Sequence, residues 1–370
     1  MDAKTFVVKV GTRVLTDSSG RIDLHRIKSL AEGLNAIADS GRRAVLVSSG
    51  AVAAGVAKLN LPHRPTNLAA LQAVAAVGQT DLIRIYERYL AAGGRHAAQV
   101  LLTAADLRRR SGYLNVRNTL AKIHDLRCIP VINENDSVAV AELMTTFGDN
   151  DSLAAAVDGL YNDSVLVILS DVAGLYDGPP TSERAKVIDV VQGVTDAIRS
   201  LAQPHDSRTS RGGMISKIEA AAKANSHGHA AIIAPGTDDR VLQKILAGQS
   251  VGTLFRPDRQ PIRGRRRWIR AEAEVAGRLV VDRGAVAALT DTGASLLAVG
   301  MTAVIGNFRR GDVVDVVDDR NKIVAKGLVN YPSAEAAKLC GHQAHEIESI
   351  LGHRPDEAVV HRDNLVLVDG

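Results

Sequence analysis

Short apolar runs alternate with longer stretches of helical periodicity through the first 255 residues of the chain. Near-continuous apolar runs of this kind are typical of strands in a sheet that is covered by helices on both faces. We expect such strands at residues 6–10, 44–47, 128–132, 165–169 and 230–234. Residues 24–40 have the spacing of an amphipathic helix that ends before Gly41. The pattern predicts an α/β fold with a mostly parallel central sheet sandwiched by helices.

The pattern changes after Phe255. Residues 256–267 contain six arginines, two prolines and one glycine, a composition that is typical of a linker or an exposed bend. Beyond it, short strand-like runs separated by glycines indicate a small β-barrel. We therefore expect one domain over residues 1–255, a linker over 256–272 and a small C-terminal β-barrel domain over 273–370.

Composition narrows the class of protein. Of the 370 residues, 46% are hydrophobic and 23% are charged, which suffices for a sizeable core and excludes a chain that is disordered throughout. The net charge of +4 permits contact with a polyanion without requiring it. The two cysteines, Cys128 and Cys340, are too few for a disulfide framework or a four-cysteine metal site. No apolar run reaches the roughly 18 residues of a membrane span, so we expect a cytoplasmic protein.

Two glycine turns follow predicted strands, where open α/β sheets bind ligands. Lys9 lies in a buried strand just before Gly11, a costly position unless its ammonium meets an anion or reaches solvent at the strand end. The segment Ser48-Ser49-Gly50 follows the second strand, and its backbone N–H groups could bind an anion, although an ordinary serine N-cap is the alternative. A Walker-type phosphate loop is absent from the sequence.

A third basic segment, residues 210–217, leads into a predicted helix. Lys217 falls near the N-terminus of this helix, where a cation opposes the helix dipole by about 0.3–1 kcal/mol. A bound anion would relieve that conflict. A solvated lysine is the alternative interpretation.

Acidic and amide side chains face these basic segments. Residues 133–136 (Asn-Glu-Asn-Asp) follow one predicted strand, and residues 149–151 (Asp-Asn-Asp) precede a predicted helix. Helix capping would account for one of these residues but not for a run of three. Together they could bind an α-amino group, orient a lysine or hold hydrated Mg²⁺. Ser170 and Asp171 end a further strand, where a nucleotide could lie.

In their order along the chain, these motifs match one family. They are VKVGT at 8–12, SSGAVAAG at 48–55, PVINEND at 130–136, FGDND at 147–151, GLY at 174–176 and GGM at 212–214. Further matches are SVGTLF at 250–255, RWI at 267–269, GNF at 306–308 and VHRD at 360–363. The chain resembles the glutamate 5-kinases, a branch of the amino acid kinase family that carries a C-terminal PUA domain.

The resemblance implies a role for each matching residue. Lys9 and Lys217 would neutralise the transferring phosphoryl group, and Asp151 would hold these lysines in place. Glutamate would be bound by Ser49, Asn133, Asp136, Asp149 and Asn150. The nucleotide would be bound by Lys9, Gly11, Gly50, Ser170, Asp171, Arg211, Gly212, Gly213, Met214, Ile215, Ser216 and Lys217. Mg²⁺ would be held mainly by the ATP phosphates, without a metal site of the protein's own.

The implied reaction is the ATP- and Mg²⁺-dependent phosphorylation of the side-chain carboxylate of L-glutamate to L-glutamyl 5-phosphate, the first step of proline biosynthesis. The resemblance also implies a homo-oligomer, either a dimer or a tetramer, feedback inhibition by proline, and transfer of the product to glutamyl phosphate reductase. The alternatives are an N-acetylglutamate or aspartate kinase of the same fold and an RNA-binding PUA protein. Nucleic acid is not an expected partner, because the arginines fall in the linker and Trp268 has no aromatic neighbours in sequence on which bases could stack.

Two groups of histidines have a simpler interpretation. His227 and His229 are expected at a helix end or turn. Cys340, His342 and His345 have loose metal-like spacing but are expected on an exposed helix.

Overall fold

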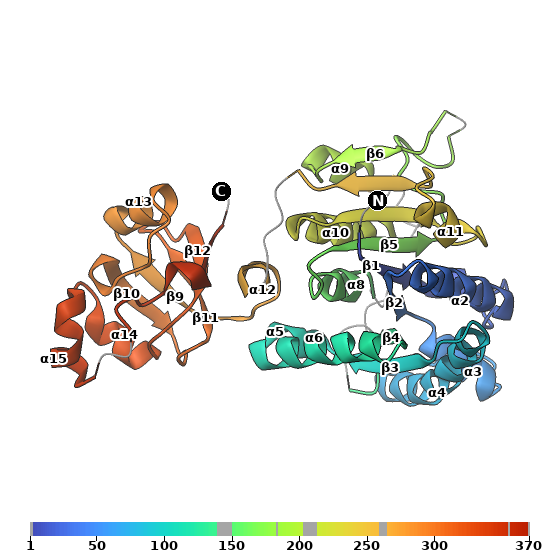
Figure 1. Cartoon of the computed structure of the whole chain (residues 1–370), viewed down its shortest axis with the longest axis horizontal. Helices are drawn as coiled ribbons and strands as arrows, with labels where there is room; N and C mark the ends of the chain where they lie inside the picture. The colour runs from blue at the N-terminus through green and yellow to red at the C-terminus, as the bar shows by residue number, and fades with distance from the viewer. Residues whose placement is uncertain are drawn as a thin grey trace. The chain divides into compact units, whose positions relative to one another are not determined.

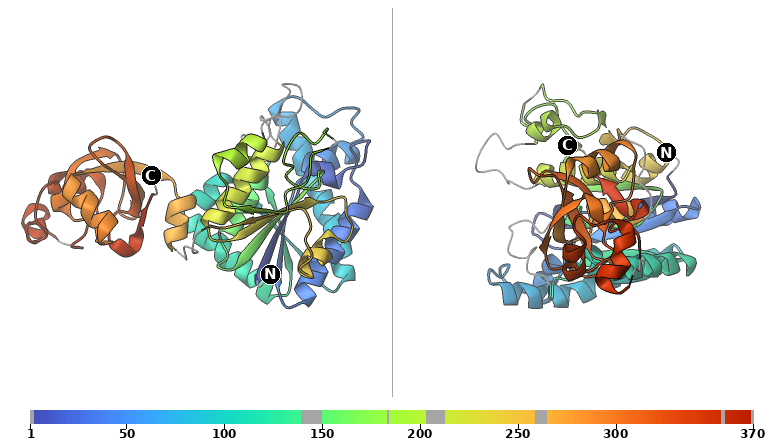
Figure 2. Two further views of the ribbon diagram at one scale, coloured as in Figure 1. Left: turned by 90° about the horizontal axis from the view of Figure 1, so that it is seen from above. Right: turned by 90° about the vertical axis from the view of Figure 1, so that its left-hand side faces the viewer.

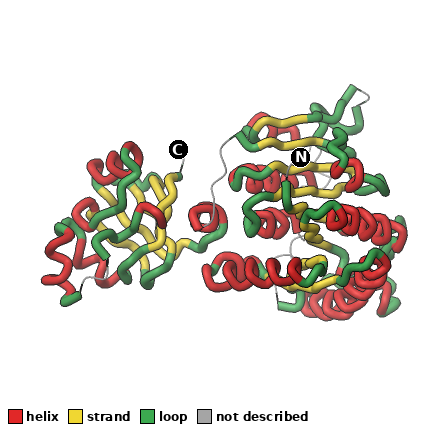
Figure 3. Tube along the Cα trace, in the orientation of Figure 1, coloured by secondary structure: helices red, strands yellow, loops and turns green. Residues whose placement is uncertain are grey.

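The computed structural model describes residues 3–138, 150–182, 184–202, 213–258, 265–353 and 356–368. The chain divides into two compact units, which are considered separately below (Figures 1 and 3). The first comprises Met1–Leu107 and Ser111–Pro261, and the second comprises Arg108–Arg110 and Ile262–Gly370.

An eight-stranded sheet forms the centre of the first unit, in the order β3-β4-β2-β1-β5-β7-β8-β6. Every neighbouring pair is parallel except β7 and β8, which are antiparallel. The strands are β1 (Thr5–Val10), β2 (Arg43–Ser48), β3 (Ala97–Leu102), β4 (Ile129–Glu134), β5 (Ser164–Ser170), β6 (Val190–Gln192), β7 (Ala230–Pro235) and β8 (Thr253–Arg256). The predicted mostly parallel sheet is confirmed.

The five strands that the apolar runs predicted are β1, β2, β4, β5 and β7. The sequence analysis missed β3, β6 and β8. Both β3 and β6 are edge strands with exposed positions, so neither has the continuous apolar signature of a strand that is buried on both faces. Strand β8 has only four residues.

Helices cover both faces of this sheet (Figure 2). The helices are α1 (Thr12–Leu15), α2 (Leu24–Asp39), α3 (Ala51–Lys58), α4 (Leu68–Ala92), α5 (Ala104–Arg108), α6 (Arg110–Asp125), α8 (Asn150–Asp158), α9 (Asp196–Leu201), α10 (Gly213–Ser226) and α11 (Val241–Leu246). On one face α2 packs against α4 and α11, and on the other α8 packs against α10.

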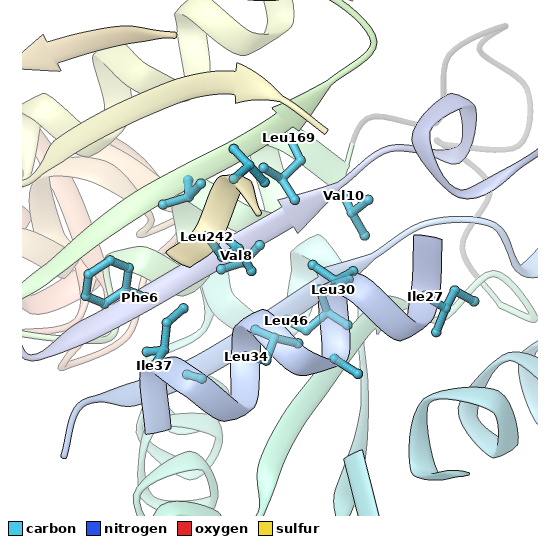
Figure 4. Close-up of a cluster of buried hydrophobic side chains, with 14 of the residues drawn as sticks. Phe6, Val8, Val10, Ile27, Leu30, Leu34, Ile37, Leu46, Leu169 and Leu242 are labelled. Atoms are coloured by element: carbon cyan, nitrogen blue, oxygen red, sulfur yellow. The ribbon is translucent and has the colours of Figure 1, made fainter. Parts of the chain in front are cut away.

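Strand β1 shows how this layering positions chemistry. Phe6, Val8 and Val10 point to one face and join a core with Leu34 of α2 and Leu242 of α11 (Figure 4). Successive residues of a strand point to opposite faces, so the side chain of the intervening Lys9 points toward the face covered by α8.

By length and composition, α4 is the one described helix that could cross a membrane. Leu82, Tyr86 and Leu90 of this helix are nevertheless part of the core beneath the sheet. Helix α4 therefore has the contacts of a core helix.

Two glycines bring α3 and α4 into backbone contact. A Cβ atom on Gly78 of α4 would overlap the carbonyl oxygen of Ala51, and one on Gly55 of α3 would overlap the carbonyl oxygen of Val74. Because these clashes are with backbone atoms, a rotamer change cannot relieve them. The helices can cross this closely only where both lack a side chain.

We expect Gly78→Ala to lower the melting temperature by about 5–10 °C, because overpacking costs roughly 2–3 kcal/mol. The direction of the change in melting temperature is informative, since Gly→Ala within a helix normally stabilises the protein by about 1 kcal/mol. Thermal unfolding followed by circular dichroism measures the change. Thr80→Ala, at an exposed position of the same helix, is the control and should change stability by less than about 0.5 kcal/mol. A neutral or stabilising Gly78→Ala would contradict the close crossing.

The second unit contains a five-stranded sheet in the order β10-β9-β11-β12-β13. All neighbouring pairs are antiparallel except β9 and β11. Its strands are β9 (Val275–Val281), β10 (Met301–Gly306), β11 (Val313–Val317), β12 (Ile323–Leu328) and β13 (Leu365–Leu367). Its helices are α12 (Arg265–Ala271), α13 (Arg283–Asp291), α14 (Ser333–Leu339), α15 (Ile347–Leu351) and the short 3₁₀ segments η1 (Ala298–Gly300), η2 (Ala344–Glu346) and η3 (Arg362–Asn364).

This sheet has a core of its own that includes Phe308, Val316 and Tyr331. Helix α12 falls within residues 256–272, where we expected a linker. Its Trp268 and Ile269 side chains are buried.

Candidate active site

The candidate site lies at one edge of the eight-stranded sheet. Strands β1, β2, β4 and β5 are parallel, so their carboxyl ends meet at the same edge. That edge carries Lys9, Ser49, Asn133 and Ser170, which the sequence analysis had selected as site residues from four separate motifs. The sheet topology brings these four residues together.

The carboxylate of Asp151 connects the two candidate lysines. Lys9 Nζ lies 2.6 Å from Asp151 Oδ1, and Lys217 Nζ lies 3.5 Å from Asp151 Oδ2. Asp151 Oδ2 also accepts a hydrogen bond of 2.8 Å from the hydroxyl of Ser216. Lys217 Nζ donates a further bond of 2.7 Å to the carbonyl of Gly213, in the first turn of α10. Two ammonium groups that are 208 residues apart in the sequence are thus held on one carboxylate.

Burial and neighbouring charges shift the pKa of Asp151 in opposite directions; the side chain of this residue is 1% exposed. Burial raises the pKa of its carboxyl group, while the ammonium groups of Lys9 and Lys217 lower it by more, so that its pKa is below the usual value. The carboxylate is therefore ionised at neutral pH. The trio of side chains carries a net charge of +1 and is suited to an anion.

A chain of buried amides lies next to this trio. The Asn150 amide donates hydrogen bonds to the Ser48 carbonyl at 2.9 Å, the Ser49 hydroxyl at 2.9 Å and the Asn133 side-chain oxygen at 3.0 Å. Asn133 in turn donates to Gln79 Oε1 at 2.8 Å. Asn150 and Asp151 are consecutive residues of the first turn of α8, so the amide network and the charged trio are held by one helix.

A cavity of about 740 Å³ opens beside these amides. Its lining includes Ser49, Gly50, Asn133, Asp136 and Asn150, and thereby most of the residues expected to bind glutamate. Burial raises the pKa of Asp136 to about 6, with a further contribution from the negative charge of Glu134.

Two glycines expected to contact the nucleotide begin helices at the same edge. Gly50 precedes α3 with φ of +102°, a conformation that L side chains rarely adopt. Gly11 precedes α1, and a Cβ at this position would make an ordinary van der Waals contact of 3.5 Å with Lys9 Nζ. Of the two, Gly50 is the position whose backbone conformation favours glycine.

The remaining nucleotide candidates divide into two groups. Ser170 ends β5 and Asp171 follows it, and Arg13 pairs with Asp171 at 3.3 Å between Nη1 and Oδ2. Gly213, Met214, Ile215, Ser216 and Lys217 form the start of α10. Asp149, Arg211 and Gly212 lie outside the described residues.

Comparison with known proteins identifies the family. The model of the amino acid kinase family matches residues 4–235, and the model of the PUA domain matches residues 277–351. The chain is 56% identical over 366 residues to a glutamate 5-kinase of Rhodopirellula baltica, covering 99% of this chain and 94% of the relative. The chain belongs to the amino acid kinase family. The resemblance inferred from the motifs is confirmed.

Other relatives with the same name are similar over their whole length. The glutamate 5-kinases of Thioalkalivibrio sulfidiphilus and Caldanaerobacter subterraneus are each 44% identical, with 97% of each relative covered. Among solved structures, a UMP kinase from Bacillus anthracis matches 71% of this chain at 14% identity with a TM-score of 0.47, a likeness too distant to bear on activity.

Basic residues of this candidate site were missed by the sequence analysis. Arg21, His63 and Arg64 line the 740 Å³ cavity, and Arg64 lies close enough to Asp136 to lower its pKa. His63 and Arg64 stand between two prolines in the connection from α3 to α4. The sequence did contain one feature that could have indicated His63 and Arg64: they lie between two prolines, and such a rigid turn can hold charged side chains in a fixed position.

Two of the carboxylates at this edge are paired with basic side chains, Asp151 with Lys9 and Lys217, and Asp171 with Arg13. Within the described ranges, the cluster of three metal-ligand side chains that the structure contains lies elsewhere, at Asp158, His227 and His229.

Proposed function

We propose that this chain transfers the γ-phosphoryl group of ATP to the side-chain carboxylate of L-glutamate, forming L-glutamyl 5-phosphate at the entry to proline biosynthesis. The observation that carries the proposal is the placement of Lys9 and Lys217 on the two oxygens of Asp151, beside a cavity lined by amides. The 56% identity to a glutamate 5-kinase over 99% of this chain supports the same reaction.

The chemistry requires positive charge and position more than proton transfer. A glutamate side chain has a pKa of about 4.3 and is already ionised at neutral pH, so no general base is needed. One carboxylate oxygen attacks the γ-phosphorus, the new O–P bond forms, and the bond to the β–γ bridging oxygen breaks to release ADP. The difficulty is that two anions must meet, and phosphoryl transfer is catalysed largely by fixed positive charge on the transferring group.

The three residues of the charged trio divide this task. Lys9 and Lys217 stabilise the equatorial oxygens of the transferring phosphoryl group, and Asp151 keeps the two ammonium groups from repelling one another out of position. Magnesium enters as part of the substrate, MgATP. Gly11, Gly50 and the first turn of α10 supply backbone N–H groups for the phosphates.

The cavity offers groups for each end of free glutamate. The carboxylate of Asp136 is suited to the α-ammonium group. The Ser49 hydroxyl, which accepts from Asn150 and keeps its own hydrogen, and the second N–H of the Asn133 amide suit carboxylate oxygens. We further assign the α-carboxylate to Arg64, which lies on the same cavity wall as Asp136. N-acetylglutamate has no α-ammonium group, so it could not form the ion pair with the Asp136 carboxylate.

The proposal has finer parts that follow the family. The enzyme works in the cytoplasm as a homo-oligomer, proline inhibits it, and the acyl phosphate passes to glutamyl phosphate reductase. Both cysteines, Cys128 and Cys340, are free thiols, as suits a reducing compartment.

An acyl-phosphate assay tests the reaction. With MgATP and hydroxylamine, we expect L-glutamate to give the hydroxamate at least about 100-fold faster, per kcat/KM, than N-acetyl-L-glutamate or L-aspartate, since a charged pair or a mispositioned acceptor costs several kcal/mol. Omission of Mg²⁺ is the control for the nucleotide, and added proline tests inhibition. A preference for N-acetylglutamate would overturn the substrate assignment but leave the kinase fold in place.

A further inference from the structure

A second polar cluster lies at the opposite edge of the eight-stranded sheet. Asp158 ends α8, while His227 and His229 stand in the turn between α10 and β7. The turn position agrees with the sequence analysis, but the burial was not foreseen. The side chains of Asp158, His227 and His229 are 0%, 1% and 3% exposed.

The two imidazoles converge on one oxygen. Asp158 Oδ2 lies 2.7 Å from His229 Nδ1 and 3.7 Å from His227 Nδ1. One potential ligand atom from each of the three residues lies within 4.8 Å of the other two. In a tetrahedral zinc site with bonds of about 2.0–2.1 Å, ligand atoms stand roughly 3.3 Å apart. The 3.7 Å separation is close to that value, whereas the 2.7 Å separation is a hydrogen bond that the ion would replace.

The surroundings of the three side chains are also built for close convergence. A Cβ on Gly159 would lie 2.7 Å from His227 Cε1, so the glycine after Asp158 makes room for the imidazole. The hydroxyl of Ser164, the first residue of β5, lies 2.7 Å from Asp158 Oδ1 and 2.9 Å from His229 Nδ1. The hydroxyl is placed either to orient these two side chains or to act as a fourth ligand in a tetrahedral site.

We propose that Asp158, His227 and His229 bind a divalent transition-metal ion, with Zn²⁺ as the best match to the donor set. Two imidazoles and a carboxylate suit zinc and its neighbours, whereas Mg²⁺ and Ca²⁺ prefer oxygen ligands alone. The site is structural, because its three ligands are buried away from solvent. This inference does not depend on the proposed reaction.

The position of the site in the fold indicates what the ion stabilises. Helix α8 begins with Asn150 and Asp151, and α10 carries Ser216 and Lys217 in its first turns. The ion would join the far ends of these two packed helices through Asp158 and His227. It would thereby fix the register of the helices that hold the charged trio at the other edge.

Metal content of the full-length protein is the direct test. We expect the untagged protein from zinc-supplemented medium to retain about one Zn²⁺ per chain after gel filtration with EDTA, because ion exchange at buried ligands requires local opening. Mass spectrometry of the metals measures this. Zn²⁺ should raise the melting temperature by at least about 5 °C, and Mg²⁺ should not.

Two variants and a matched control locate the ion. Asp158→Asn preserves shape and removes the carboxylate, and His227→Ala removes one imidazole beside Gly159; each should lower zinc occupancy at least about 10-fold. His96→Ala is the control, because the His96 ring is exposed and pairs with Glu87 at 2.7 Å. It should leave occupancy unchanged.

Cobalt substitution keeps the test independent of variant folding. Wild-type protein loaded with Co²⁺ should show the intense visible bands of a four-coordinate site with nitrogen and oxygen ligands. If wild-type protein carries no more Zn²⁺ than Asp158→Asn and shows no such bands, the proposal is overturned, and the cluster is a hydrogen-bonded network only.

Discussion

Lys217→Ala is expected to lower kcat for the phosphorylation of glutamate by about 10³-fold while changing the KM for glutamate by less than about 3-fold. The ammonium group acts on charge that spreads over the transferring phosphoryl group, so its removal weakens the transition state more than the ground state. Asp151 also holds Lys9 at 2.6 Å and Ser216 at 2.8 Å, so we expect Lys9 to stay paired in the variant. Steady-state kinetics with the hydroxamate assay separates the two constants.

The control for this experiment is a lysine of the same unit that lies away from the site. Lys28→Ala removes an exposed ammonium that faces Glu32 at 3.9 Å, and it should leave kcat unchanged. Lys217→Arg keeps the positive charge and should recover part of the lost rate. An unchanged kcat in Lys217→Ala would remove the main physical argument for the proposed reaction.

Asp136→Asn is expected to raise the KM for glutamate by about 10–100-fold with little change in kcat, because a hydrogen bond to a charged group is worth roughly 1.5–3 kcal/mol. The variant keeps the shape of the side chain but loses the charge that would pair with the α-ammonium group. KM and kcat measured between pH 5 and 8 give the result. An unchanged KM would contradict the assignment of Asp136.

The pH dependence distinguishes a charge effect from a packing effect. Because burial and Glu134 raise the pKa of Asp136 to about 6, the ionised form that binds an ammonium group is lost as the pH falls through 6. The wild-type KM should therefore rise between pH 7.5 and 5.5, and Asp136→Asn should lack this rise. Glu134→Gln removes a negative charge that raises the pKa of Asp136, so the rise should move to lower pH.

Much of the fold could be predicted because buried parallel strands leave a continuous apolar signature. The runs that became β1, β2, β4, β5 and β7 were each placed within about two residues of their bounds. Strands β3 and β6 have exposed positions, and their pairing is decided by the neighbouring strand. We expected a linker over residues 256–272 because of its composition. Composition does not show which side chains are buried, and Trp268 and Ile269 are buried.

The candidate site, too, could be predicted from the sequence only in part. Lys9 and Lys217 were recognisable as lysines in electrostatically costly positions, and the motifs around them matched a family. Arg21 was not recognised, since ordinary surface arginines have the same local sequence features, and Arg64 was missed although it lies with His63 between two prolines. Arg21 lies in the connection between β1 and α2, and Arg64 lies in the connection between α3 and α4. Only the tertiary structure shows that both arginines line the same cavity as the amides.

The sequence alone determined which chemical groups are available and in which local conformations: a lysine inside a strand, amides after a strand, glycines where helices begin. These features depend on neighbours within a few residues, so they are encoded locally. Only the tertiary structure decided which groups meet, because one carboxylate on α8 pairs with lysines from β1 and α10. It also decided that His227 and His229 lose their contact with water, since burial depends on the packing of α8, α10 and β5 around them.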